Sequence, residues 1–287
     1  MSGAGLIREV AVIGAGTMGN GIAQTFAGAG ANVRLIDVAP AALDKGMATI
    51  RGSLERFVKK GTLNQADAEA SLARIKACAR IEDALGAELV VEAIVEKADV
   101  KRKVFAALDG ICAPQTILSS NTSSISITEI AAATKRADRV IGMHFMNPVP
   151  LMKLVEVIRG QETSADTTQR VVACSEALGK TPVEAQDYPG FVSNRVLMPM
   201  INEAIYCLME GVSTREGIDT VMKLGMNHPL GPLALADLIG LDVCLDILGV
   251  LHQGLGDPKY RPCPLLRRMV AAGRLGKKNG KGFYDYA

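Results

Sequence analysis

The feature that most constrains this fold is a glycine-rich turn close to the N-terminus. Residues 9–13 (EVAVI) form a short apolar run, residues 14–19 (GAGTMG) follow it at once, and residues 20–29 have a helical pattern. This G-x-G-x-x-G spacing is typical of the first strand–turn–helix unit of a parallel sheet, in which the turn receives the pyrophosphate of a dinucleotide. Free N–H groups and the positive end of the helix dipole would face that anion.

Each glycine of the turn has its own expected role. Gly14 permits the tight turn, Gly16 lets the backbone approach the phosphates, and Gly19 lets the helix pack close to the strand. A second predicted strand, residues 32–36, ends at Asp37, about 20 residues downstream, where the ribose hydroxyls should lie. Its carboxylate would accept their hydrogen bonds and repel a 2′-phosphate, which favours NAD over NADP. The alternative is an ordinary aspartate in a surface turn; the strand–turn–helix–strand order favours cofactor binding.

The first part of the chain alternates strands and helices, as in a parallel sheet with helical crossovers. Strands are predicted at residues 10–13, 33–36, 77–81, 89–92, 116–119, 140–143, 153–158 and 181–185, with a helix at residues 167–178 between the last two. From residue 188 onward the pattern is helical, with helices predicted at residues 191–210, 214–223, 233–239, 242–254 and 264–272. Proline and glycine punctuate residues 187–190. We therefore predict an α/β fold with a doubly wound Rossmann-type domain over residues 1–187 and an all-α domain over residues 188–287.

A long helical stretch, residues 41–74, separates the second and third predicted strands and is interrupted at residues 61–64. Because it is longer than an ordinary crossover, we expect it to project as a helical hairpin. Its first arm carries the basic residues Arg51, Arg56, Lys59 and Lys60. Such a run is usually a solvated face, but it would also suit a phosphorylated ligand, and charge alone leaves both interpretations open.

Composition excludes several classes of function. The 287 residues carry a formal net charge of only +2, and with no tryptophan they offer little for nucleic acid to bind or stack upon. The six cysteines lack metal-ligand spacing, which predicts reduced thiols and no metal site. The apolar run at residues 233–251 contains Asp237, Asp242 and Asp246, so it does not suit a membrane span. The first residues have no secretory-signal pattern, and we expect a cytoplasmic protein.

A nicotinamide enzyme that oxidises an alcohol needs a base for the hydroxyl proton. His144 lies just past the predicted strand at residues 140–143, on the side of the sheet where ligands bind, and imidazole exchanges protons near neutral pH. Glu156 lies in an otherwise apolar strand, where an inward-facing carboxylate would need a partner. Orienting and charging the imidazole is one such role. A structural histidine and a solvated glutamate on an edge strand are the alternatives; His228 and His252 have no evident partner and are expected to be structural.

A row of hydroxyl and amide groups, residues 119–124 (SSNTSS), follows another predicted strand at the same end of the sheet. Residues 126–129 (SITE) fit a capping box for the next helix. Both interpretations hold together, because Ser123 lies outside the box.

These segments together resemble the L-3-hydroxyacyl-CoA dehydrogenases, and among them the short-chain bacterial 3-hydroxybutyryl-CoA dehydrogenases. The similar segments are residues 14–19, 90–96 (VVEAIVE), 120–124 (SNTSS), 144–156 (HFMNPVPLMKLVE), 187–195 (DYPGFVSNR), 231–232 and 276–284. They cover nearly the whole chain in the order and spacing of the family. Met146 stands at a position often held by phenylalanine, which should matter little.

The resemblance implies reversible, NAD-dependent oxidation of (S)-3-hydroxybutyryl-CoA, or another short L-3-hydroxyacyl-CoA, to the 3-ketoacyl-CoA. His144 would be the general base, Glu156 its orienting partner, Ser123 a hydrogen-bond donor to the reacting oxygen, and Asn194 a residue that positions the substrate. The implied cofactor contacts come from Gly14, Gly16, Thr17, Met18, Gly19, Asp37, Glu96, Lys101, Ser123, Asn147 and Lys278. Ser53 and Lys60 on the hairpin match coenzyme A contacts of the family, which favours the phosphate-binding interpretation of the basic arm. The resemblance and the apolar helical domain also suggest a homodimer.

Other functions stay open on the sequence. A dehydrogenase of a free hydroxy acid or sugar acid would share the fold and cofactor but would have no use for the basic arm. The β-hydroxyacid dehydrogenases that oxidatively decarboxylate use a lysine where the second domain begins, and residues 191–195 contain none. A non-catalytic NAD-binding protein would not need Ser123, His144, Glu156 and Asn194 together.

Overall fold

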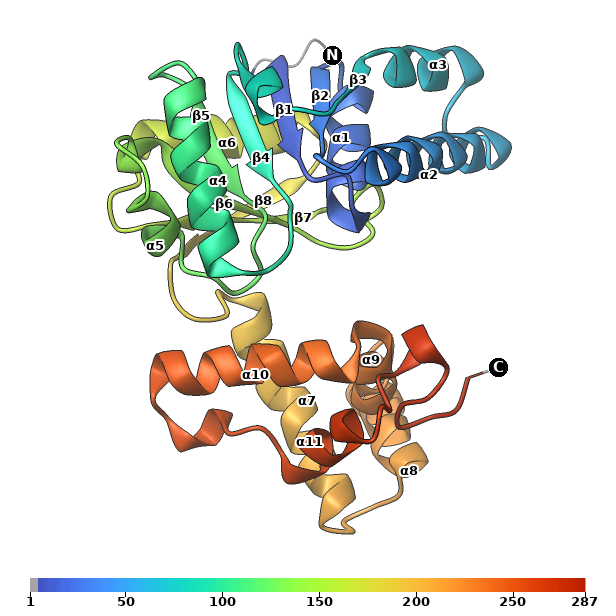
Figure 1. Ribbon diagram of the computed structural model, residues 1–287. Coiled ribbons are helices and arrows are strands. Elements are labelled where there is room, and N and C mark those ends of the chain that lie inside the picture. Colours follow the sequence, from blue (N-terminus) through green and yellow to red (C-terminus); the bar gives the residue numbers. More distant parts are fainter. Residues whose placement is uncertain (1–4, 287) are drawn as a thin grey trace. The chain divides into compact units, whose positions relative to one another are not determined.

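The computed structural model describes residues 5–286 (Figure 1). The chain divides into two compact units, Met1–Asp187 and Tyr188–Ala287. No helix within the described residues is both long and apolar enough to cross a membrane.

The first unit is built on an eight-stranded sheet in the order β3-β2-β1-β4-β5-β6-β7-β8. The strands are β1 (Glu9–Ile13), β2 (Asn32–Ile36), β3 (Ile75–Cys78), β4 (Leu89–Glu92), β5 (Ile117–Ser120), β6 (Val140–Phe145), β7 (Leu154–Arg159) and β8 (Thr181–Gln186). β1 to β6 pair in parallel, β7 is antiparallel to β6, and β8 is parallel to β7. β1 has β2 on one side and β4 on the other, so the strand order reverses there, and such a switch point is where open α/β sheets bind ligands. The predicted doubly wound sheet is confirmed.

The helices of the first unit are α1 (Thr17–Gly28), α2 (Pro40–Lys59), α3 (Gln65–Ala73), α4 (Ala98–Ile111), α5 (Ile127–Ala131) and α6 (Ala165–Ala177). The central strands are buried along almost their whole length, as Val12, Leu89 and Val91 show, because parallel strands are covered on both faces. The expected helical hairpin is present: α2 and α3 pack against each other and extend past the β3 edge of the sheet (Figure 1).

The second unit is helical, with α7 (Ser193–Met209), α8 (Arg215–Thr220), α9 (Pro232–Ile239), α10 (Leu241–Leu255) and α11 (Pro264–Ala271). The buried Asp237 of α9 accepts hydrogen bonds from the backbone N–H groups of Phe283 and Tyr284 and from the Tyr286 hydroxyl. Asp219 of α8 accepts a further bond from the Tyr284 hydroxyl, at 2.9 Å. These two carboxylates fasten the segment at residues 281–286 onto the helices.

Two predicted strands differ from the observed strands by more than one residue. Residues 77–81 were expected as a strand, but β3 occupies Ile75–Cys78 and Ile81 already begins a 3-10 turn. β6 was expected to end at residue 143 but continues to Phe145, so His144 lies inside the strand. The reason is tertiary: the antiparallel partner β7 pairs with this stretch of β6, beyond the last pair that β5 makes with β6, at Gly142.

Several predicted helices also differ in their ends. In the first unit, α1 begins at Thr17 and α6 at Ala165, earlier than the expected residues 20 and 167. The helix expected at residues 191–210 begins at Ser193, and Phe191 before it has a positive φ of 49°. The helix expected at residues 214–223 ends at Thr220, because the chain widens into a π-helical turn at Val221–Gly225.

Candidate active site

The glycine turn has the backbone shape that the motif predicts. Gly14 has a φ of +101°, and a Cβ placed on it would lie 2.6 Å from the carbonyl oxygen of Ala93. A Cβ on Gly19 would lie 1.8 Å from the carbonyl oxygen of Gly14, so the start of α1 packs directly on the turn. Thr17 and Met18 are the first residues of α1. A side chain at Gly14 or Gly19 is therefore excluded by the fold itself.

The N-terminus of α1 fits an anionic ligand. No side chain caps this helix, and its first turn holds no acidic residue, so its first N–H groups lack the carboxylate or hydroxyl that often satisfies them. A Cβ on Gly16 would meet no atom within 4 Å, which leaves open space beside the turn. The cofactor's diphosphate could approach the backbone here.

Asp37 lies beside the same turn, at the carboxyl end of β2. Its Oδ2 accepts a hydrogen bond from the N–H of Ala15 at 2.9 Å, and its Oδ1 accepts one from the N–H of Ala39 at 3.0 Å. The carboxylate is thus fixed next to the phosphate-binding turn, which is the place that a ribose-binding acid occupies in this kind of sheet.

His144 and Glu156 face each other across the β6–β7 ladder, in which they are a direct cross-strand pair. The imidazole Nδ1 lies 2.8 Å from the Glu156 carboxylate, at Oε2. Both residues are buried, at 8% and 2% exposure. A hydrogen bond to Nδ1 fixes the ring orientation, and the carboxylate stabilises the protonated imidazole, which suits the ring to act as a base.

The loop that carries Ser123 is organised around the carboxylate of Glu96. Its Oε1 accepts hydrogen bonds from the Ser123 N–H at 2.8 Å, the Ser124 N–H at 3.2 Å and the Thr122 hydroxyl at 2.6 Å. Burial alone raises the pKa of Glu96, but the Lys101 ammonium and these hydrogen bonds outweigh it, so the pKa is lowered overall. Glu96 is therefore a charged acceptor that holds this loop in place.

Lys101 is enclosed between two carboxylates. Its Nζ lies 2.7 Å from Glu92 Oε1 and 3.2 Å from Glu96 Oε2, and its side chain is 1% exposed. Glu92 was not among the candidates predicted from the sequence, although, like Glu156, it is a carboxylate in an otherwise apolar strand.

Asn121 belongs to the polar row at residues 119–124, but no role of its own was predicted for it. Its side-chain oxygen accepts a hydrogen bond from the Phe145 N–H at 2.9 Å. The loop of Ser123 is thereby tied to the strand that carries His144. This contact depends on the pairing of β5 with β6, and no local pattern points to it.

The remaining candidate residues lie in separate places. Asn147 is exposed in the β6–β7 loop, Ser53 is half-buried in α2, and Lys60 is exposed just after that helix. In the second unit, Asn194 is buried in the first turn of α7, and Lys278 forms an ion pair with Asp242 at 2.5 Å. The structure thus brings together His144 with Glu156, Glu96 with Ser123 and Lys101, and Asp37 with the glycine turn.

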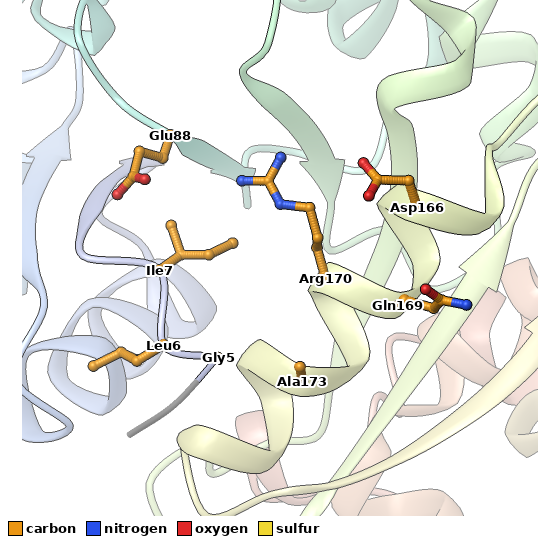
Figure 2. Close-up of a pocket in the computed structure, with 8 residues that line it drawn as sticks. All are labelled: Gly5, Leu6, Ile7, Glu88, Asp166, Gln169, Arg170 and Ala173. Atoms are coloured by element: carbon orange, nitrogen blue, oxygen red, sulfur yellow. The ribbon is translucent and has the colours of Figure 1, made fainter. Parts of the chain in front are cut away.

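A cavity of about 360 Å³ lies at the amino ends of the central strands, away from the carboxyl ends that carry the candidate site. Figure 2 shows Glu88, which precedes β4, on one side, and Asp166 and Arg170 of α6 on the other. Residues 5–7, which precede β1, also line it. Because it lies at the amino ends of β1 and β4, it is separate from the edge where the glycine turn, Asp37 and Ser123 lie.

Models of two known domains match this sequence. Residues 9–188 match the NAD binding domain of 3-hydroxyacyl-CoA dehydrogenase, and residues 190–286 match the C-terminal domain of the same enzyme. The two matches cover nearly the whole chain, one in each compact unit.

Known proteins are similar over their full length. A probable 3-hydroxybutyryl-CoA dehydrogenase of Bacillus subtilis is 60% identical over 280 residues, covering 98% of this chain and 98% of the relative. A 3-hydroxybutyryl-CoA dehydrogenase of Bradyrhizobium diazoefficiens is 54% identical, covering 99% of this chain and 97% of the relative. The crystal structure of (S)-3-hydroxybutyryl-CoA dehydrogenase PaaH1 from Ralstonia eutropha superposes with a TM-score of 0.96 at 54% identity, covering 98% of this chain and 99% of that one. The resemblance noted in the sequence is confirmed, and this chain belongs to the 3-hydroxyacyl-CoA dehydrogenase family.

Proposed function

We propose that this protein catalyses the reversible oxidation of (S)-3-hydroxybutyryl-CoA to acetoacetyl-CoA, with NAD as the cofactor. The observation that carries the proposal is the His144–Glu156 contact of 2.8 Å, in a domain whose glycine turn and Asp37 suit NAD. The names of the relatives at 54% and 60% identity support the same substrate.

His144 is the general base of this proposal. In the oxidation, the C3 hydroxyl loses its proton to the imidazole while the C3–H bond breaks and its hydride leaves, so that C3 becomes a carbonyl. Glu156 engages Nδ1, so proton exchange falls to Nε2, and the carboxylate stabilises the imidazolium that forms. A positioned general base contributes about 10²–10⁴-fold to the rate.

The other site residues position the reactants. Ser123 donates a hydrogen bond to the C3 oxygen, and Asn194 places the substrate. Bound NAD supplies the hydride acceptor. The turn residues Gly14, Gly16, Thr17, Met18 and Gly19 would hold its diphosphate, and Asp37 would hold its adenosine ribose. Glu96, Asn147 and Lys278 would add further contacts, and Lys101 would contribute through its ion pair with Glu96. In this proposal, the first unit binds most of the cofactor, and the second unit contributes Lys278 to cofactor binding, Asn194 to substrate binding, and a surface for assembly.

The basic arm of the hairpin belongs to the same proposal. Arg51, Arg56, Lys59 and Lys60 lie on α2 or directly after it, and all four are exposed. Phosphate groups of coenzyme A suit such a cationic surface, and Ser53 adds a hydroxyl on the same helix. A free hydroxy acid would make no use of it.

We also propose a homodimer and a cytoplasmic location. The second unit exposes large apolar side chains, among them Val196 at 69%, Leu224 at 80% and Met226 at 61%, and apolar groups at such density favour a protein contact. Buried thiols such as Cys174 and Cys244 suit a reducing compartment. Light scattering on the purified protein and fractionation of cells test these two statements.

The proposed reaction is tested by following NADH consumption with acetoacetyl-CoA, beside free acetoacetate and beside NADPH. We expect rapid turnover with the thioester and NADH only. Equal activity with free acetoacetate would favour a hydroxy-acid dehydrogenase, and a preference for NADPH would show that Asp37 does not select the cofactor. No turnover in any arm would favour a non-catalytic NAD-binding protein.

A further inference from the structure

We propose that Glu92 is a positioning residue for the reaction. Together with Lys101 it forms a buried ion pair that fixes the carboxylate of Glu96, and through Glu96 the loop that carries Ser123. This inference rests on the proposed function, because it takes Ser123 as the residue that contacts the reacting oxygen.

Glu92 is the last residue of β4 and is fully buried, at 0% exposure. Its Oε1 accepts hydrogen bonds from Lys101 Nζ at 2.7 Å and from the Ile94 N–H at 2.8 Å. Its Oε2 accepts a hydrogen bond from the Ser120 hydroxyl at 2.7 Å. A carboxylate this deeply buried is costly unless it is paired and hydrogen-bonded, and here every partner comes from the segments that follow β4 and end β5.

The position of Lys101 in α4 is not one at which a lysine stabilises the helix. The residue falls in the first turns of this helix, near the positive end of the helix dipole, where a cation is disfavoured. Two carboxylates, Glu92 and Glu96, hold it there instead. Because Lys101 is 1% exposed, we infer that its contribution to the reaction passes through Glu96.

Two routes lead from Glu92 to the loop of Ser123. In the first, Lys101 binds Glu96 Oε2, which orients Oε1 toward the N–H groups of Ser123 and Ser124. In the second, the Ser120 hydroxyl donates to Glu92 and accepts a hydrogen bond from the Thr122 N–H at 3.2 Å. Both routes fix the backbone next to Ser123, so the loss of the Glu92 charge should loosen the serine without removing any contact that the serine itself makes.

The test compares Glu92→Gln with Asp109→Asn. Asp109 is a matched control because it forms a largely buried ion pair with Arg136, at 2.6 Å, near the other end of the same helix α4. For both variants we would measure the melting temperature, kcat and KM with acetoacetyl-CoA, and the Kd of NADH by fluorescence titration. We expect both to melt at a lower temperature. Only Glu92→Gln should lose kcat, by roughly 10- to 100-fold, since small misplacements of a reacting group cost this much.

A double substitution shows whether Glu92 acts through Ser123. If it does, the variant that combines Glu92→Gln with Ser123→Ala should have nearly the kcat of Ser123→Ala alone, because residues in one network are not additive. A merely structural Glu92 would give the product of the two single effects. Either that multiplicative result or a wild-type kcat in Glu92→Gln would overturn the inference.

A milder variant covers the case in which Glu92→Gln does not fold. Ser120→Ala removes one hydroxyl from the second route and keeps both charges. It should lower kcat by roughly 3- to 10-fold on the same reasoning about placement, and an unchanged kcat would then overturn the inference. Failure of the proposed function gives a different result: the unsubstituted protein itself would not oxidise NADH with acetoacetyl-CoA, and the role of Ser123 would fall with it.

Discussion

His144 and Glu156 owe their contact to strand direction. They are separated by twelve positions in the chain, yet β7 returns antiparallel to β6 and places the two side chains opposite each other. In such a pair both side chains lie on the same face of the sheet. The geometry of the proposed base is therefore set by backbone pairing, and each side chain needs only to be of the right type.

Replacing the imidazole tests the base directly. His144→Ala should lower kcat by about 10²–10⁴-fold, the contribution of a positioned general base. The Kd of NADH should stay the same, since the diphosphate turn and Asp37 are untouched. Steady-state kinetics with acetoacetyl-CoA and a fluorescence titration with NADH measure the two effects. Near-normal turnover would exclude His144 as the base.

Replacing the carboxylate separates orientation from charge. Glu156→Gln keeps a hydrogen-bonding partner for Nδ1 but cannot stabilise the imidazolium, so kcat should fall by about 10-fold or more with the fold intact. Glu184→Gln, on the exposed face of β8, is the matched control and should leave kcat unchanged. Circular dichroism reports the fold. If the rate of Glu156→Gln equals that of the control at every pH, Glu156 is merely a strand residue.

The sequence alone could predict the types of these residues but not all of their contacts. His144 and Glu156 were recognisable from their place at or near strand ends and from an acid in an apolar run. The roles of Glu92 and Asn121 were not predicted, because Ser120 and Phe145 become their neighbours only when β4, β5 and β6 pair. Lys101 reaches Glu92 only when the chain turns from β4 into α4. Such contacts depend on sheet order, which no local pattern encodes.

At the scale of elements, the glycines of the turn between β1 and α1 have two separate roles: some allow the chain to fold, and one leaves space for a ligand. Gly14 and Gly19 satisfy the fold, because a Cβ on either would overlap backbone atoms. The fold does not require glycine at Gly16, since a Cβ there would meet open space. The absence of a side chain at Gly16 therefore matters only for the ligand.

Two alanine substitutions distinguish these roles. Gly19→Ala should lower the melting temperature of the ligand-free protein, because its Cβ would lie 1.8 Å from the Gly14 carbonyl oxygen. Gly16→Ala should leave that melting temperature nearly unchanged and raise the Kd of NADH by about 10-fold or more, since its methyl group occupies the space of the diphosphate. Thermal unfolding and fluorescence titration give both values. An unaltered Kd in Gly16→Ala would place the diphosphate elsewhere.

Element types followed from the sequence more reliably than element ends did. β1, β2 and β4 are short buried runs bounded by polar residues or glycine, and this local pattern sufficed. The ends of β3 and β6 depend on the neighbouring strands: β3 stops where its pairing with β2 stops, and β6 extends as far as β7 pairs with it. The hairpin was visible because its turn interrupts a helical stretch too long for a crossover.

On the scale of the whole molecule, buried carboxylates fasten the C-terminal segment of the second unit to its helices. The second unit is held together by Asp237, which is 1% exposed and binds Phe283, Tyr284 and Tyr286. Burial, followed by the hydrogen bond to the Asp237 carboxylate, raises the pKa of Tyr286 to about 12. Burial and Asp219 likewise raise the pKa of Tyr284 above its ordinary range.

These tyrosines predict how stability changes at alkaline pH. A pKa raised in the folded state means that the neutral phenol stabilises the fold. That stability is complete below the ordinary tyrosine pKa, about 10, and is lost as the pH rises through about 12 for Tyr286. Tyr286→Phe should lower the free energy of unfolding at neutral pH and flatten part of its decline between these values. Urea titrations across the range measure both.

A control tyrosine and a contrary result complete this test. Tyr188→Phe changes a tyrosine that is 60% exposed and should leave the alkaline decline as it is in the unsubstituted protein. If Tyr286→Phe has the same slope as Tyr188→Phe, then Tyr286 does not couple unfolding to pH.

The β6–β7 register has a consequence for how this family can vary in length. If an insertion or deletion in the loop between these strands were absorbed by sliding β7 one position, Glu156 would turn to the opposite face and Val155 or Val157 would stand across from His144. A slide of two positions would restore the face but present Leu154 or Ile158, which carry no charge. Neither odd nor even shifts preserve the pair. Evolution and protein engineering alike must therefore accommodate any change of length within the loop itself, while the ladder on both sides stays in place.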